Sequence, residues 1–267
     1  MNPYILAAPL AFLVGISLGL LGGGGSILAV PIFVYVLSVP PKSAIASSLL
    51  VVGLTSLVGA LRHGARGHVD LRSAFVFGGA GVVGASVGSR VAALQVVPGS
   101  VLILVFAALM ITVATLLLRG PRSNSAGSLP AGLETDETRR VPRVRLGATG
   151  LLTGMLTGLL GAGGGFIIVP SLLLVGRLPV RTAIGTSLLV IALNCGAGIL
   201  GFLGKVPIRW SLGFAFATAS IAGILVGAGI AARTRPARLR KGFAIFVLLA
   251  GVAILIERGG EILRSGP

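Results

Sequence analysis

Apolar stretches long enough to form membrane helices run through most of the chain, and short polar or glycine-rich breaks separate them. A helix satisfies its own backbone hydrogen bonds, so it is the form in which such a stretch crosses a bilayer. The opening segment, 1–21, lacks the basic start of a secretory signal, and we expect it to remain in the mature protein. Further helices are predicted over 27–39, 43–61, 72–93, 99–118, 144–160, 166–176, 182–203, 210–232 and 240–257.

The pattern of the first half recurs in the second half without a gap. The stretch Gly15 to Pro31, GISLGLLGGGGSILAVP, matches Gly154 to Pro170, GMLTGLLGAGGGFIIVP, at an offset of 139 residues. The same register pairs 48–51 with 187–190, both of which read SLLV. A period this long with no insertion indicates two copies of one structural unit rather than an array of short repeats.

Composition indicates that this fold lies in a membrane. Hydrophobic residues make up 55% of the chain, charged residues 10%, and the mean hydropathy is +1.04. Because so little polar surface is available, the sequence predicts an all-α, polytopic membrane protein built from two homologous repeats. The net charge of +16 would favour nucleic acid in a soluble protein, but here the basic residues lie between apolar segments, as they do at the cytoplasmic face of membrane proteins. Nucleic acid is therefore not an expected partner.

Composition also divides the chain. A stretch rich in glycine, proline, serine and charge separates the two halves, and it cannot bury a core. The predicted units are a first membrane repeat, 1–118; a polar, flexible cytoplasmic linker, 119–143; a second membrane repeat, 144–258; and a polar tail, 259–267.

The basic residues change sides between the repeats. In the first repeat they lie in loop 62–72 and in the linker, whereas in the second they concentrate in 233–241. If basic loops face the cytoplasm, the chain between the linker and 233–241 crosses the membrane an even number of times. The glycine-broken element must then contribute no crossing, as a re-entrant hairpin, or two crossings, as a pair of spans. We therefore expect the two repeats to be inverted, as in many secondary transporters.

Each glycine run is expected to break its helix inside the membrane. A glycine in a helix costs roughly 1 kcal/mol relative to alanine, so a run of them favours unwound backbone, whose N–H groups can bind an anion at the start of the next helix. The alternative is that glycines only allow close helix packing, which we expect for the pairs Gly15/Gly19, Gly84/Gly88, Gly154/Gly158 and Gly223/Gly227. The candidate substrate-binding residues of the two breaks are Gly22, Gly23, Gly24, Gly25, Ser26, Pro31, Gly161, Gly163, Gly164, Gly165 and Pro170.

All six acidic residues lie in loops or near the ends of the chain. A transporter for cations ordinarily needs a carboxylate inside the membrane, so an anionic or neutral solute is favoured. Hydroxyl and amide side chains follow both breaks, and such donors can bind an oxyanion without a full charge. Their alternative role is ordinary hydrogen bonding within or between helices. The candidates are Ser47, Ser48, Thr55, Thr186, Ser187 and Asn194, of which Asn194, an amide within an apolar run, is the strongest.

Two further groups of polar residues each have two possible interpretations. Lys42 and Arg181 occupy matching positions and either attract anions or anchor helix ends at the membrane interface. His63, His68 and Asp70 share one loop, where they form either a proton relay or a solvated surface. No metal site and no cofactor is expected, and the lack of a Walker A, GxSxG or zincin motif disfavours an enzyme.

The chain resembles the sulfite exporter TauE/SafE family of membrane permeases. The resemblance spans nearly the whole length and includes the motifs GLLGGGGSILAVP, AIASSLLVV, HGARGHVDLRS, GLLGAGGGFIIVP and AIGTSLLVIALN. It implies a multi-pass permease of the bacterial inner membrane, with about eight transmembrane helices, that moves small anions such as sulfite or organosulfonates. Ala162 departs from the pattern by interrupting the second glycine run.

The resulting hypothesis is a secondary transporter that binds an oxyanion between the two broken elements and exports it. An anion channel and a membrane assembly factor without transport are the alternatives. The expected partners are a small anionic solute and the lipid bilayer, and association with further copies of the chain is compatible with the sequence.

Overall fold

The computed structural model describes residues 3–94, 99–119, 143–161 and 164–231, with single positions between 245 and 256. The predicted linker, apart from its end residues, the tail 259–267 and most of the predicted helix 240–257 lie outside this part. The regular elements are α1 (Pro3–Leu21), η1 (Gly24–Leu28), α2 (Ala29–Pro31), η2 (Ile32–Val36), α3 (Pro41–Gly64), α4 (Leu71–Ala93), α5 (Gly99–Arg119), α6 (Arg143–Leu160), α7 (Gly165–Leu174), α8 (Val180–Phe202) and α9 (Trp210–Ala231).

These helices confirm the prediction of an all-α, multi-pass membrane protein. Within the described residues, α3, α4, α8 and α9 contain segments long and apolar enough to cross a bilayer, and α1, α5 and α6 contain shorter apolar segments. Phe75 and Leu200 are 74% and 70% exposed, so large apolar side chains cover the outer surface that lipid would contact.

The helix predicted over 27–39 is replaced by three short helical pieces, η1, α2 and η2. Pro31 has no backbone N–H, and after it Leu37 N–H bonds the carbonyl of Ile32 at 3.1 Å, five residues back. Proline and the preceding glycines weaken the regular ladder, and a wider π turn takes its place.

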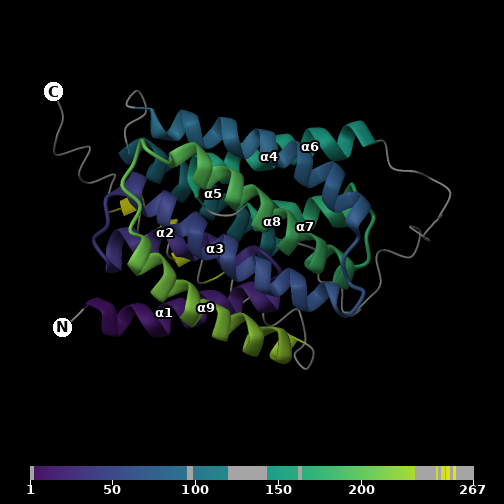
Figure 1. The fold of residues 1–267 in the computed structure, drawn as a ribbon, viewed down its shortest axis with the longest axis horizontal. Coiled ribbons are helices and arrows are strands. Elements are labelled where there is room, and N and C mark those ends of the chain that lie inside the picture. Colours follow the sequence, from purple (N-terminus) through teal and green to yellow (C-terminus); the bar gives the residue numbers. More distant parts are fainter. Residues whose placement is uncertain are drawn as a thin grey trace.

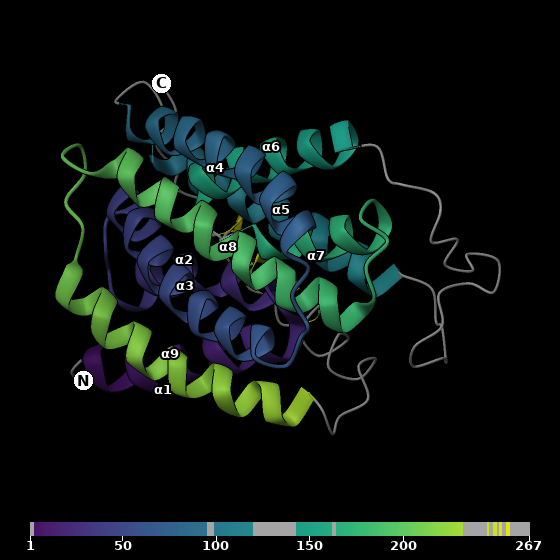
Figure 2. The ribbon, with the colours of Figure 1, turned by 45° about the vertical axis from the view of Figure 1, so that its right-hand side comes forward.

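Helices α3 and α8 pack in opposite directions at the centre of the molecule. Gly59 of α3 faces Leu188 of α8, whereas Gly198, further along α8, faces Leu49, earlier in α3. Figures 1 and 2 show this pair between α4 and α6 on one side and α1 and α9 on the other.

The flanking helices form two pairs, α1 with α9 and α4 with α6, each running in parallel. Gly15 and Gly19 of α1 meet the backbone at Ser220 and Ile224 of α9, so both helices advance together. A Cβ on any glycine of the four predicted packing pairs would collide with backbone of the partner helix. Close packing is therefore confirmed for Gly15, Gly19, Gly84, Gly88, Gly154, Gly158, Gly223 and Gly227.

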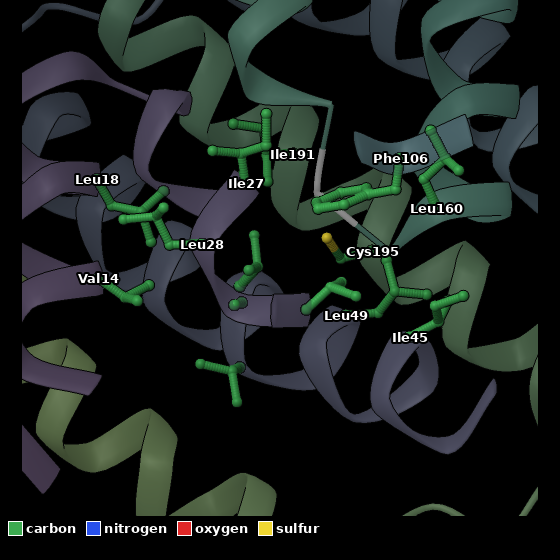
Figure 3. Packing of buried hydrophobic residues seen from close by; sticks show 14 of the residues in the cluster. Val14, Leu18, Ile27, Leu28, Ile45, Leu49, Phe106, Leu160, Ile191 and Cys195 are labelled. Atoms are coloured by element: carbon green, nitrogen blue, oxygen red, sulfur yellow. The ribbon is translucent and has the colours of Figure 1, made fainter. Parts of the chain in front are cut away.

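The buried apolar side chains of both halves meet around the broken elements (Figure 3). Leu18 of α1 and Ile27 of η1 are fully buried there, as are Leu49 of α3 and Ile191 of α8. Cys195 lies in the same cluster and is a free, buried cysteine. The core thus surrounds the glycine runs.

Candidate functional site

The first glycine run ends α1 and reverses the chain. Gly22 closes the helix with a bond from its N–H to the carbonyl of Leu18 (2.9 Å) and has a φ of +71°, which favours glycine. A Cβ on Gly25 would collide with Leu18 N, so η1 folds back onto α1. Ser26 Oγ donates to the carbonyl of Gly23 at 2.7 Å and holds this turn.

The second run makes an equivalent break. Gly161 N–H bonds the carbonyl of Thr157 at 2.9 Å, and its φ of +68° is close to that of Gly22, its counterpart in the first repeat. Gly164 then precedes α7, which contains Pro170. Gly163 and Ala162 lie outside the described residues. Both predicted breaks are therefore present in the fold.

The two breaks cross each other at direct backbone contact. A Cβ on Gly23 would collide with Gly165, and one on Gly165 would collide with Gly23. The side chain of Ile191 from α8 packs against the same contact, 2.7 Å from a Cβ placed on Gly23. The structure thus brings Gly23 and Gly165, one candidate glycine from each half of the chain, into contact, and only glycine fits where they meet.

Ser48 and Ser187 hold the turns at the starts of α3 and α8. Ser48 Oγ donates to the carbonyls of Ile45 and of Gly161, both at 2.8 Å, and so ties α3 to the second break. Its counterpart Ser187 donates to the carbonyl of Ile184 at 2.8 Å. Ser48 thereby lies next to the crossing, where its hydroxyl bonds the backbone.

Ser47 and Thr186 contact the other repeat instead. Asp70 N–H donates to Thr186 Oγ1 at 2.9 Å, and Arg209 N–H donates to Ser47 Oγ at 3.3 Å. Each hydroxyl therefore accepts a bond from the segment that leads into a helix of the opposite repeat. Thr55 Oγ1 donates to the carbonyl of Val51 at 2.7 Å within α3. These bonds correspond to the structural alternative considered for such residues.

Asn194 of α8 is fully buried, and neither atom of its amide has a hydrogen-bond partner within the described part of the chain. A Cβ on Gly81 of α4 would lie 2.6 Å from Oδ1 and 2.8 Å from Nδ2, so the amide occupies the space that this glycine leaves. Ser56 Oγ of α3 is likewise buried and has no hydrogen-bond partner within the described residues.

Lys42 and Arg181 lie at opposite ends of the bundle, because α3 and α8 begin at opposite ends. Lys42 Nζ donates to the carbonyl of Leu94 at 2.8 Å, at the end of α4. Arg181 is exposed at the start of α8. The bond of Lys42 is of the kind expected for a residue that anchors a helix end.

The loop that contains His68 and Asp70 is seated on the start of α8. His68 O and His63 Cβ are the atoms that a Cβ on Gly185 would meet first. His63 Nδ1 lies 3.0 Å from the carbonyl of Gly59. The Asp70 carboxylate accepts from Arg72 N–H and from Ser73 N–H, and it caps α4. Within the described residues no group of three metal-ligating side chains is found.

A ladder of buried threonines on α6 was not selected from the sequence. Thr157 Oγ1 donates to the carbonyl of Thr153 at 2.9 Å, and Thr153 Oγ1 donates to that of Thr149 at 2.6 Å. Thr157 Oγ1 is also the atom nearest to a Cβ placed on Gly164. Their spacing of four residues, which puts them on one helix face, is the signal that would have revealed them.

Comparison with known proteins agrees with this architecture. The sulfite exporter TauE/SafE family model matches residues 7–254. A probable membrane transporter protein of Xylella fastidiosa is 34% identical over 246 residues, which cover 91% of each chain. The probable membrane transporter protein YdhB of Bacillus subtilis is 24% identical, over 91% of this chain and 97% of its own. No solved structure matches significantly.

These relatives are named as transporters rather than enzymes, in agreement with the expectation from the motifs. The family match covers nearly the whole chain, including both glycine breaks and the helices around them. The chain therefore belongs to the sulfite exporter TauE/SafE family of membrane transporters.

Proposed function

We propose that this membrane transporter is a secondary permease for small anions, in which two inverted repeats move about a binding region at the crossing of the glycine breaks. The observation that carries the proposal is the contact of Gly23 with Gly165 at the centre of the antiparallel pair α3 and α8. In transporters with inverted repeats, the solute site lies where the broken helices of the two repeats meet.

Contacts at matching positions support the inverted repeat. Gly84 of α4 meets the backbone of Leu151, and 139 residues later Gly223 of α9 meets the backbone of Phe12, itself the counterpart of Leu151. The turns also match, because Ser38 and Arg177, again 139 residues apart, have φ values of 50° and 51°. Equivalent contacts on antiparallel central helices are what a two-fold axis in the membrane plane would produce.

The directions of the helices support a broken element that brings the chain back to the side of the membrane where α1 begins. Gly213 of α9 meets Leu50 of α3 and Ile224 of α9 meets Gly59, so α9 runs parallel to α3 as well as to α1. Since α1 and α3 run in the same direction, the segment between them must bring the chain back. This geometry favours a hairpin or a pair of spans over a single long crossing, and it agrees with the even count from the basic loops.

The charges of the described residues favour an anion. Asp70 is the one acidic residue among them, and its carboxylate caps α4 instead of facing the crossing. A cation at the crossing would find no carboxylate among the described residues, whereas an anion would face the N-terminal end of α7, where the N–H groups of Ile167 and Ile168 bond the carbonyl of Gly164 and those that precede them lie outside the helical ladder. The family name adds sulfite, and by chemical likeness organosulfonates, as the first solutes to test.

Export across the bacterial inner membrane fits the energetics. A monovalent anion leaving a negative interior is favoured by about 2.3 kcal/mol per 100 mV of membrane potential, so no carboxylate relay is required for coupling. We propose the potential as the driving force.

Flux in proteoliposomes tests the function. Wild type should transport sulfite and small sulfonates with saturable kinetics, while Gly165→Ala, which places a methyl group against Gly23, should lose most flux. Gly196→Ala is the matched control, because a Cβ there meets nothing within 4 Å. Flux that does not saturate would indicate a channel, and no flux of any anion in folded wild type would overturn transport in favour of an assembly factor. Equal flux in both glycine variants would contradict the site.

A further inference from the structure

The amide of Asn194, like the hydroxyl of Ser56, is a buried polar group that the hydrogen bonds of the described residues leave unexplained. Its side chain is fully buried, and both Oδ1 and Nδ2 lack a hydrogen-bond partner within the described residues. An unpaired buried amide is unfavourable, because it has given up its hydrogen bonds to water without replacement. Such groups are few in native proteins, and each calls for an explanation, of which a functional role is one.

The amide lies near the proposed site along α8. Ile191, whose side chain closes the crossing at Gly23, precedes Asn194 by three residues, which is about one helical turn or 5 Å along the axis. Cys195, the next residue, lies against Gly53 of α3, where the two central helices pack. Figure 3 shows Ile191 and Cys195 within the buried cluster at the centre. Asn194 is thus within reach of a solute that separates the two breaks.

Gly81 keeps a space open for this amide. Any side chain at position 81 would collide with Oδ1 and Nδ2 of Asn194, at 2.6 and 2.8 Å from a Cβ. On its other side Gly81 supports α6, because a Cβ on Gly154 would collide with its carbonyl. The amide therefore sits where α4, α6 and α8 approach one another, and not on the lipid-facing surface.

Other hydroxyls near the crossing are already engaged as donors. Ser26, Ser48 and Thr157 each donate to a backbone carbonyl. The Asn194 amide differs because it has both a free donor and a free acceptor. A fully deprotonated oxyanion offers only acceptors and would leave Oδ1 unpaired.

We infer that Asn194 binds the transported solute with both atoms of its amide, and that the preferred solute is a monoanion that carries an O–H or N–H group of its own. The inference rests on the proposed anion transport and specifies its substrate class. Nδ2 donates to an oxygen of the anion, and Oδ1 accepts the proton-bearing group. Hydrogen sulfite and hydroxysulfonates satisfy both atoms, whereas sulfate and plain alkanesulfonates satisfy one. With no basic side chain among the residues that meet at the crossing, a monoanion is also easier to desolvate than a dianion.

A pair of sulfonates of similar size tests this inference in proteoliposomes. Ethanesulfonate lacks an O–H group, and 2-hydroxyethanesulfonate has one. Wild type should prefer the hydroxylated compound by about tenfold, the value of one well-placed hydrogen bond. Asn194→Leu should bring the ratio close to one. Ser220→Ala is the matched control, because Ser220 is a buried hydroxyl that already donates to the carbonyl of Ala11, and it should keep the wild-type ratio.

The outcomes separate the two proposals. A wild-type preference that Asn194→Leu leaves intact, or no wild-type preference between the two sulfonates, overturns the role of Asn194 while leaving anion transport in place. No flux of either sulfonate or of sulfite in folded wild type overturns transport itself, and the inference with it. If Asn194→Leu does not fold, Asn194→Thr, which introduces the residue of the first repeat, should also reduce the ratio. Thermal shifts of the purified protein with each sulfonate give a second measure of the preference.

Discussion

Two groups of residues, Thr55 with Ser220 and Asn194 with Gly81, occupy matching positions in the two halves of the chain but differ in hydrogen bonding. We call them the first and the second corner. In the first, Thr55 donates to Val51 and Ser220 donates to the carbonyl of Ala11 at 2.8 Å, so both hydroxyls are engaged. In the second, the corresponding residues are Asn194 and Gly81, and the amide is unpaired within the described residues. The glycine contacts that build both corners are the same. Shared contacts therefore maintain the scaffold, and the positions where the halves differ are where a site for one particular solute can arise.

The largest expected effect concerns the shared scaffold. Gly84→Val and Gly223→Val each push a side chain into the backbone of a partner helix, at Leu151 and Phe12 respectively. Each should lower the free energy of unfolding in detergent by about 3 kcal/mol or prevent folding, because the helices cannot separate without losing their other contacts. Gly79→Val on α4 is the control, since a Cβ there meets nothing within 4 Å. A large loss at one position and none at the other would show that the two corners are not built alike.

A smaller effect, of opposite sign, separates the corners. Asn194→Leu removes an unpaired buried amide and should raise the free energy of unfolding by about 2 kcal/mol while impairing transport. Thr55→Val, which removes a hydroxyl that is already bonded, should change stability by about 1 kcal/mol or less. Chemical denaturation of both variants in the same detergent measures the difference. Destabilisation by Asn194→Leu would mean that the amide has a partner in the folded state.

The smallest effect distinguishes the two serines after the breaks. Ser48→Ala removes a bond that reaches Gly161 in the other half and should cost about 1 kcal/mol. Ser187→Ala removes a bond within its own helix turn, and we expect a change of about 0.5 kcal/mol or less. Unfolding midpoints of the two variants, measured side by side, provide the comparison. Equal losses would indicate that Ser187 also holds the first break.

Much of the fold was predictable because it depends on local composition. The apolar runs predicted most helices to within a few residues, and the glycine runs marked both breaks. The exception was 27–39, where the propensity of apolar residues for helix hid the effect of Pro31 on the ladder. Small residues four apart predicted close helix packing, but only the contacts identified the parallel partners α1 with α9 and α4 with α6.

The candidate site was predictable in residue type but not in hydrogen bonding. The sequence placed Ser47 and Thr186 in the same class as Ser48, yet the first two accept N–H groups from the opposite half and only Ser48 reaches a break. Whether a hydroxyl is engaged depends on which carbonyl or N–H approaches it in the folded chain. No local pattern contains that information.

The amino-acid sequence by itself determined the membrane environment and the positions of the breaks, because hydrophobicity and the helix-breaking effect of glycine act over short stretches. Only the tertiary structure decided that Gly23 crosses Gly165, that α3 and α8 run in opposite directions, and that Asn194 has no partner in the described fold. Those facts arise from contacts between segments far apart in the chain, such as Ser48 and Gly161, which are 113 residues apart, and packing alone selects them.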